Sequence, residues 1–117
     1  MFIMSVEVNW HIPKLRPDEK LVWMSPIDFL ASVPHPSTYH CSALVGIHDV
    51  SIEKGGQGWD AGSLRSIYKR IKEGKPIDAL YLDYTFLSHG YPQHEGRHRA
   101  LVCYKLGIKQ VPVIIRR

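Results

Sequence analysis

The stretch from His94 to Arg99 has the side chains that could bind or transfer a phosphate group. One carboxylate, two imidazoles and two guanidiniums surround a single glycine, Gly96. A glycine lets the backbone approach a ligand closely. If a helix begins at this glycine, its free amide groups and the positive end of its dipole stabilise an anion. The sequence therefore predicts a phosphate-binding turn from Glu95 to Arg99.

Each residue of this turn has an expected role. Phosphate or nucleotide binding is assigned to Gly96, Arg97, His98 and Arg99, because guanidiniums donate paired hydrogen bonds to phosphate oxygens and imidazole adds a donor. Glu95 and His98 are the expected catalytic residues. Cations at a helix N-terminus are unfavourable by roughly 0.3–1 kcal/mol each, so an anion is expected to offset the two arginines. The alternative is that these side chains bind no ligand and are solvated charges at the surface of a helix start.

The same residues suggest a second type of enzyme, because His94 to His98 match the H-E-x-x-H pattern of zinc hydrolases. That chemistry needs both histidines one turn apart on a continuous helix. Pro92 and Gly96 oppose a helix through His94. No His, Asp or Glu follows His98 to act as a third ligand. A zinc-dependent hydrolase is therefore the minor alternative, and no zinc is expected.

Hydrophobic periodicity and capping residues predict the elements that position the turn. Ser25 followed by Pro26 is typical of a helix N-terminus. Apolar residues at i, i+3, i+4 and i+7 from Leu64 to Ile71 predict an amphipathic helix that Gly74 ends. Together the patterns predict strands over residues 6–11, 43–52, 79–86 and 111–115, helices over 26–33, 64–71 and 96–107, loops over 34–42 and 54–62, and a turn over 89–92.

These elements predict one α+β, or mixed α/β, domain over residues 1–117, with a small mixed sheet flanked by helices. The strand, helix and strand at the C-terminal end predict a parallel crossover. Alternation in the strand over 79–86 places Leu80, Leu82, Tyr84 and Phe86 on one face.

The composition narrows the class of protein. The 117 residues are 44% hydrophobic, and 15 Lys and Arg against 11 Asp and Glu give a net charge of +4. This mild excess, concentrated after Glu95, suits an anionic partner. Cys41 and Cys103 form no C-x-x-C pair, so a reducing cytoplasm is expected. The sequence contains no long apolar segment, so we expect neither a signal peptide nor a membrane partner.

Several motifs carry a family resemblance. The C-terminal half contains E-G-R-H-R-A from Glu95, L-G-I from Leu106 and V-P-V-I from Val111, and upstream lies I-K-E-G-K-P-I from Ile71. In order and spacing these resemble the signature of the ParB/sulfiredoxin superfamily, best over residues 43–117. The chain looks like a stand-alone ParB-like nuclease or nucleotide-binding domain without the further domains of a partition protein.

The resemblance implies that Gly96, Arg97, His98 and Arg99 hold nucleotide phosphates. Arg97 stands where sulfiredoxins have their reactive cysteine, so sulfinic acid reduction is not expected. Cys103 is no substitute, because a cysteine inside a helix is more often packed in a core.

The leading hypothesis is a nucleotide-binding phosphohydrolase or phosphotransferase that takes ATP or CTP, with nuclease activity on DNA in the same class. Mg²⁺ could enter with the nucleotide, because this ion needs only one or two carboxylates. The expected metal or neighbouring residues besides Glu95 are Asp83, Asp49 and His48. The alternative is a non-catalytic nucleic-acid or protein-binding module on the same fold.

Overall fold

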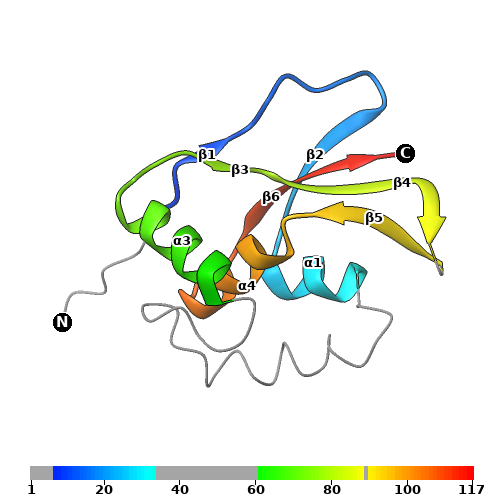
Figure 1. Ribbon diagram of the computed structural model, residues 1–117. Coiled ribbons are helices and arrows are strands. Elements are labelled where there is room, and N and C mark those ends of the chain that lie inside the picture. Colours follow the sequence, from blue (N-terminus) through cyan, green and yellow to red (C-terminus); the bar gives the residue numbers. More distant parts are fainter. Residues whose placement is uncertain (1–6, 34–60, 89) are drawn as a thin grey trace.

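A four-stranded sheet in the order β2-β6-β4-β5 is the frame of the protein (Figure 1). The computed structural model describes residues 7–33, 61–88 and 90–117. The elements are β1 (Trp10–His11), β2 (Glu19–Met24), α1 (Pro26–Ser32), α3 (Ala61–Lys72), β3 (Ile77–Asp78), β4 (Leu80–Ser88), β5 (Tyr91–Glu95), α4 (Arg97–Lys105) and β6 (Val111–Arg116). The predicted strand over 43–52 and loop over 34–42 lie outside the described residues.

The sheet is mixed, as the sequence predicts. β4 and β6 run parallel, with Leu80 opposite Val113, whereas β5 pairs with β4 and β2 pairs with β6 in antiparallel fashion. The parallel crossover between β4 and β6 is therefore confirmed. β1 and β3 form a separate two-stranded parallel pair. Helices and a mixed sheet together make this an α+β fold.

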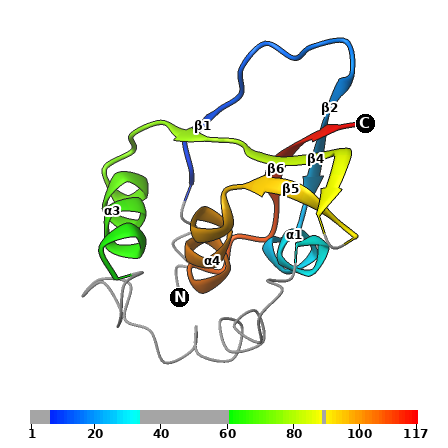
Figure 2. The same ribbon diagram turned by 45° about the vertical axis from the view of Figure 1, so that its right-hand side comes forward.

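The helices α1, α4 and α3 lie side by side, with α4 in the middle (Figures 1 and 2). This middle position explains why α4 has a run of small and apolar residues. Four successive residues, Ala100, Leu101, Val102 and Cys103, are all buried, because α1, α3 and β4 all pack against this helix. A helix covered on several sides needs no polar face. α4 is thus fixed within the core, and its N-terminus follows directly from the end of β5.

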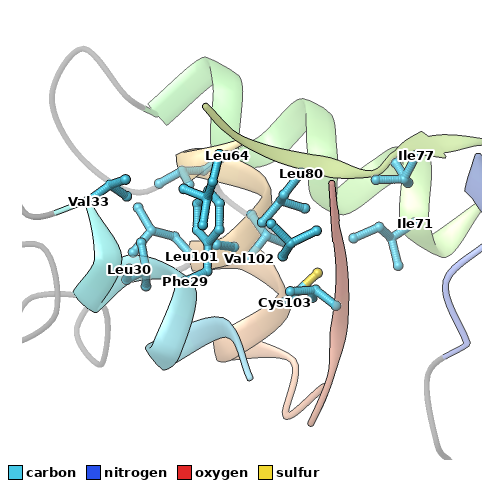
Figure 3. Packing of buried hydrophobic residues seen from close by; sticks show 14 residues of the cluster. Phe29, Leu30, Val33, Leu64, Ile71, Ile77, Leu80, Leu101, Val102 and Cys103 are labelled. Carbon is cyan, nitrogen blue, oxygen red and sulfur yellow. The ribbon is translucent and has the colours of Figure 1, made fainter. Parts of the chain in front are cut away.

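The core is continuous between the helices and the sheet (Figure 3). Phe29 from α1, Leu80 from β4 and Val102 from α4 are all fully buried. Leu64 and Ile71 add the apolar stripe of α3, and that predicted stripe is confirmed.

The start of α1 follows the predicted capping pattern. The Ser25 hydroxyl accepts a hydrogen bond from the Asp28 amide at 3.0 Å, and Pro26 occupies the first turn. Phe29 and Leu30 face the core, as expected. Local chemistry therefore sets where this helix begins.

The strands differ from the predictions in three places. The expected turn over 89–92 is present at Gly90, but β5 already begins at Tyr91, and Pro92 is tolerated there because β5 is an edge strand. β2 was not predicted, since Val22 and Trp23 are successive exposed residues that interrupt its alternation. The first strand is limited to two residues, with Val8 packed on the core outside it.

Phe86, which was expected to share a face with Leu80 and Leu82, differs from them in burial. Phe86 is 70% exposed, whereas Leu80 and Leu82 are buried and Tyr84 packs against the core. The register of β4 against β5 shifts between Asp83 and Leu87. Such an irregularity interrupts strict alternation, and residues 85–88 of β4 are all exposed.

Candidate phosphate-binding site

The five residues of the predicted turn lie together around one hollow. Its volume is about 400 Å³, and it is lined by Glu95, Gly96, Arg97, His98 and Arg99 with Ser66 and Ile67 of α3. α4 begins at Arg97, immediately after Gly96, as predicted. The first hydrogen bond of the helix runs from the Ala100 amide to the Gly96 carbonyl at 2.9 Å. The positive end of the helix dipole is therefore at this turn.

Gly96 is required by both its conformation and its surroundings. Its φ of 114° lies in the left-handed region. A Cβ atom here would lie 3.0 Å from Nη2 of Arg99 and 2.7 Å from Cγ of Leu80. Gly96 also has no side chain that could cap the helix, and no acidic residue occupies the first turn of α4. The N-terminus of the helix therefore has no carboxylate of its own within that turn.

Arg99 is held on two sides. Its Nη1 donates to Oε1 of Glu95 at 3.1 Å, and its Nη2 pairs with Oε2 of the same carboxylate. Nη2 also donates to the Ala79 carbonyl at 3.3 Å. The Arg99 side chain is only 16% exposed, and its buried Nε has no hydrogen-bond partner among the described residues. Native structures seldom leave such a donor unpaired.

Arg97 connects the turn to the neighbouring helix. Its Nη1 donates to the Val33 carbonyl at the C-cap of α1, 3.4 Å away. A cation is favourable at that end of a helix. Arg97 and His98 both line the hollow, and both are half-buried. The guanidinium of Arg97 therefore helps to fix the start of α4 against α1.

The zinc motif does not adopt the geometry of a zinc hydrolase. His94 lies in β5 and His98 lies in α4, so the two histidines are not one turn apart on one helix. The prediction that no helix passes through His94 is confirmed. Within residues 7–33, 61–88 and 90–117, no group of three His, Cys, Asp or Glu side chains is placed to hold a metal ion.

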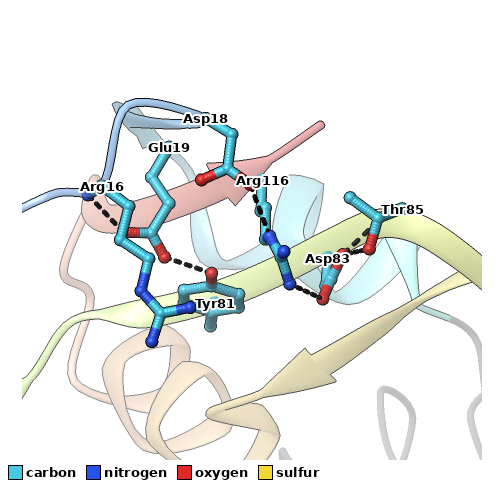
Figure 4. Close-up of polar contacts among 7 residues, drawn as sticks. All are labelled: Arg16, Asp18, Glu19, Tyr81, Asp83, Thr85 and Arg116. Carbon is cyan, nitrogen blue, oxygen red and sulfur yellow. Dashed lines mark hydrogen bonds and ion pairs between the residues drawn. The ribbon is translucent and has the colours of Figure 1, made fainter.

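Asp83 lies outside the hollow, in a polar network on the sheet (Figure 4). Its carboxylate accepts from the Thr85 amide at 2.9 Å and faces Nη1 of Arg116 at 3.4 Å. Hydrogen bonds from Thr85, then the charge of Arg116, lower the pKa of Asp83. Asp83 is therefore held by structural partners. His48 and Asp49 lie outside the described residues.

The same network includes a tyrosine next to the site. Tyr81, opposite Glu95 in the β4–β5 pair, donates its hydroxyl to Glu19. Burial, followed by this hydrogen bond, raises the pKa of Tyr81 to about 12. The bond from Tyr81 lowers the pKa of Glu19. Glu19 is thereby fixed between the tyrosine and the Arg16 amide, which donates to it at 2.7 Å.

Cys103 is a core residue, as predicted. It is fully buried in α4 and is a free thiol. Burial raises its pKa to about 12, although the charge of Arg99 opposes this. A thiol nucleophile must ionise, so this environment suppresses its reactivity.

The basic C-terminal end is partly neutralised by ion pairs. Nε of Arg116 lies 2.7 Å from Oδ2 of Asp18, and hydrogen bonding to Asp18 raises the pKa of Arg116. The Arg117 guanidinium lies over the Tyr84 ring, 4.7 Å from its centroid. These contacts reduce the charge that this end offers to a nucleic acid backbone.

Two parts of the site were not predicted. Ser66 and Ile67 line the hollow from α3, and the Ala79 carbonyl anchors Arg99. Ile67 belongs to the recognised apolar stripe, but nothing in the sequence says that α3 passes the start of α4. The carbonyl of Ala79 has no sequence signal at all, because every residue has one.

No family model matches the chain, and no curated protein or solved structure matches it. The resemblance to the ParB/sulfiredoxin superfamily is therefore still a prediction based on motifs. In the part of the chain that the structure describes, no helix is long and apolar enough to cross a membrane.

Proposed function

We propose that this protein is a ParB/sulfiredoxin-like domain that binds a nucleotide by its phosphates at the N-terminus of α4. One observation carries the proposal, namely that Glu95, Gly96, Arg97, His98 and Arg99 converge on a single hollow. The positive end of the α4 dipole favours an anion there. Two guanidiniums beside that N-terminus add charge that suits phosphate.

Nucleotide turnover is the second step of the proposal. A phosphohydrolase or phosphotransferase would use the arginines to stabilise charge on the transferred group. His98 lines the hollow and could give or take a proton there. The described residues do not fit a protein-held Mg²⁺ site, because Glu95 is paired with Arg99 and Asp83 with Thr85 and Arg116. We therefore derive no step through that ion.

Calorimetric titration tests the proposal. ATP, CTP, GTP and ADP, each with and without Mg²⁺, are titrated into wild type, Arg99→Ala and a control, Arg70→Ala. Arg70 also donates to a carbonyl, that of Pro76 at 2.7 Å, but it does not line the hollow. Micromolar binding that is lost only in Arg99→Ala supports the proposal. Absence of binding by the wild type overturns it.

The release of inorganic phosphate separates an enzyme from a binding module. Turnover that falls in His98→Ala, while nucleotide binding persists, would support a catalytic role for the imidazole. Binding without turnover would make the protein a nucleotide-binding module. Steeply salt-dependent DNA binding without nucleotide binding would instead favour the nucleic-acid alternative.

A further inference from the structure

The contact between Glu95 and Arg99 bears on which anions the hollow can accept, and the inference below rests on the proposed function. Both oxygens of the carboxylate face the two terminal nitrogens of the guanidinium. This paired geometry is the one by which arginine binds a phosphate. Glu95 therefore occupies the edge of Arg99 that a phosphate would need.

The Arg99 guanidinium cannot readily present another of its edges to a phosphate. Nη2 is tied to the Ala79 carbonyl, and the Arg99 side chain is largely buried. The Cα of Gly96 also packs closely enough that a Cβ there would be 3.0 Å from Nη2. The guanidinium is thus fixed by contacts other than the one with Glu95. A ligand reaches it by replacing Glu95.

Glu95 is the movable member of the pair. Its side chain is 67% exposed and lies at the end of the edge strand β5. It also lines a second hollow of about 450 Å³, on the side of Tyr81. The carboxylate therefore has space to enter when it leaves Arg99.

That second hollow is unfavourable for a displaced carboxylate. It is lined by two further carboxylates, Glu19 and Asp78, and by the imidazole of His11, and no lysine or arginine is among the described residues that line it. Like charges brought together raise the free energy of the open form. A ligand must therefore compensate for this cost through its own charge.

We propose that Glu95 is a specificity-determining residue that acts as an internal anion on Arg99. A singly charged anion offers the guanidinium no more charge than Glu95 already does. A diphosphate or triphosphate carries several charges and can contact the helix N-terminus as well as Arg99. The site thereby selects multiply charged phosphate chains over monoanions.

The test uses ligands without a base. Pyrophosphate and methanesulfonate are titrated by calorimetry into wild type, Glu95→Gln, Glu73→Gln and Arg99→Ala. Glutamine keeps a hydrogen-bond acceptor for Arg99 but removes the competing charge. Glu73→Gln is the matched control, because Glu73 forms an exposed ion pair with Lys75 at 3.7 Å and does not line the hollow.

We expect Glu95→Gln to bind pyrophosphate about three- to tenfold more tightly than wild type. It should also bind methanesulfonate, which the wild type rejects, and Glu73→Gln should behave as wild type. Pyrophosphate binding that is unchanged or weaker in Glu95→Gln would overturn the inference, because Glu95 would then only orient Arg99. Glu95→Ala, which removes the acceptor too, should likewise not bind pyrophosphate more weakly than wild type.

The proposed function and this inference fail in different ways. Wild-type binding that depends on Arg99 supports the proposed function, whatever Glu95→Gln does. If no variant binds pyrophosphate or a nucleotide, both are overturned. Melting curves of the wild type and all four variants establish that the compared proteins are folded.

Discussion

A Cβ atom on Gly96 would lie 2.7 Å from Cγ of Leu80, a distance that real Cβ contacts essentially never show. Leu80 is fully buried at the start of β4, so it has little room to yield. The end of β5 and the start of α4 are therefore packed directly against the central part of the sheet. The packing of the turn from Glu95 to Arg99 depends on the absence of one methyl group.

We expect Gly96→Ala to reduce the free energy of unfolding by about 2–4 kcal/mol. Part of this is the cost of a left-handed alanine, about 1–2 kcal/mol, and part is the clash with Leu80. Chemical denaturation measures the effect. Gly107→Ala is the control, since its φ is +77° but a Cβ there meets nothing within 4 Å. Equal losses in both variants would show that the contact with Leu80 is unimportant.

A double-mutant cycle tests the same contact by also changing Leu80. Leu80→Ala alone should cost about 2–5 kcal/mol, because it leaves a cavity. When combined with Gly96→Ala it should cost less than the sum of the two, by about 1 kcal/mol or more, since Cγ is gone. Strict additivity would mean that the cost of Gly96→Ala comes from backbone conformation alone.

Acid should destabilise the polar network on the sheet. The pKa values of Asp18 and Asp83 are lowered from 3.8 by hydrogen bonds, from Arg116 and from Thr85 respectively. That of Glu19 is lowered from 4.5 by Tyr81. A carboxyl with a lowered pKa stabilises the fold above its ordinary pKa and loses this effect as the pH falls through the lowered value. We therefore expect the melting temperature to drop as the pH falls below about 4.5.

Arg116→Met should make that drop shallower, because Asp18 and Asp83 lose their shared cation. Its melting temperature should already be lower at pH 7. Circular dichroism between pH 7 and pH 2 measures both effects. Arg70→Met removes a guanidinium that bonds to a carbonyl and should keep the wild-type pH dependence. Parallel curves for wild type and Arg116→Met would contradict the role given to the ion pairs.

The thiol of Cys103 should be unreactive in the folded protein. A pKa of about 12 in place of 9.0 lowers the thiolate fraction roughly a thousandfold at neutral pH. In a Cys41→Ser background, Ellman's reagent should label the native protein at least that much more slowly than the urea-unfolded chain. Similar rates in the two states would show that the thiol is accessible and ionises normally.

Local patterns predicted the elements whose signals lie within a few residues. The cap at Ser25, the stripe from Leu64 to Ile71 and the helix start at Gly96 all follow from neighbours in sequence. β5 was missed because Pro92 argues against a strand unless the strand lies at an edge. The edge position of β5 is set by the pairing of β4 with β6, which no local pattern contains.

In the candidate site, too, local features were predicted and tertiary contacts were not. The sequence grouped Glu95, Gly96, Arg97, His98 and Arg99, since they are adjacent, and the structure places all five around the hollow. Their mutual contacts were not predicted. Glu95 was expected to be catalytic or to lie beside a metal ion, and its pairing with Arg99 was not foreseen. Side-chain pairing of this kind depends on how β5 and α4 meet, which is a tertiary property.

The sheet order also constrains how the chain can fold as it is synthesised. β2 comes early in the sequence, yet its partner in the sheet is β6, with Glu19 opposite Arg116. The β4–β5 hairpin can form from neighbouring residues, whereas β2 has no partner among the described strands until β6 leaves the ribosome. Such distant pairing slows folding. Unpaired strand edges favour aggregation, so the order of the sheet delays the protection of the β2 edge until the last described strand is made.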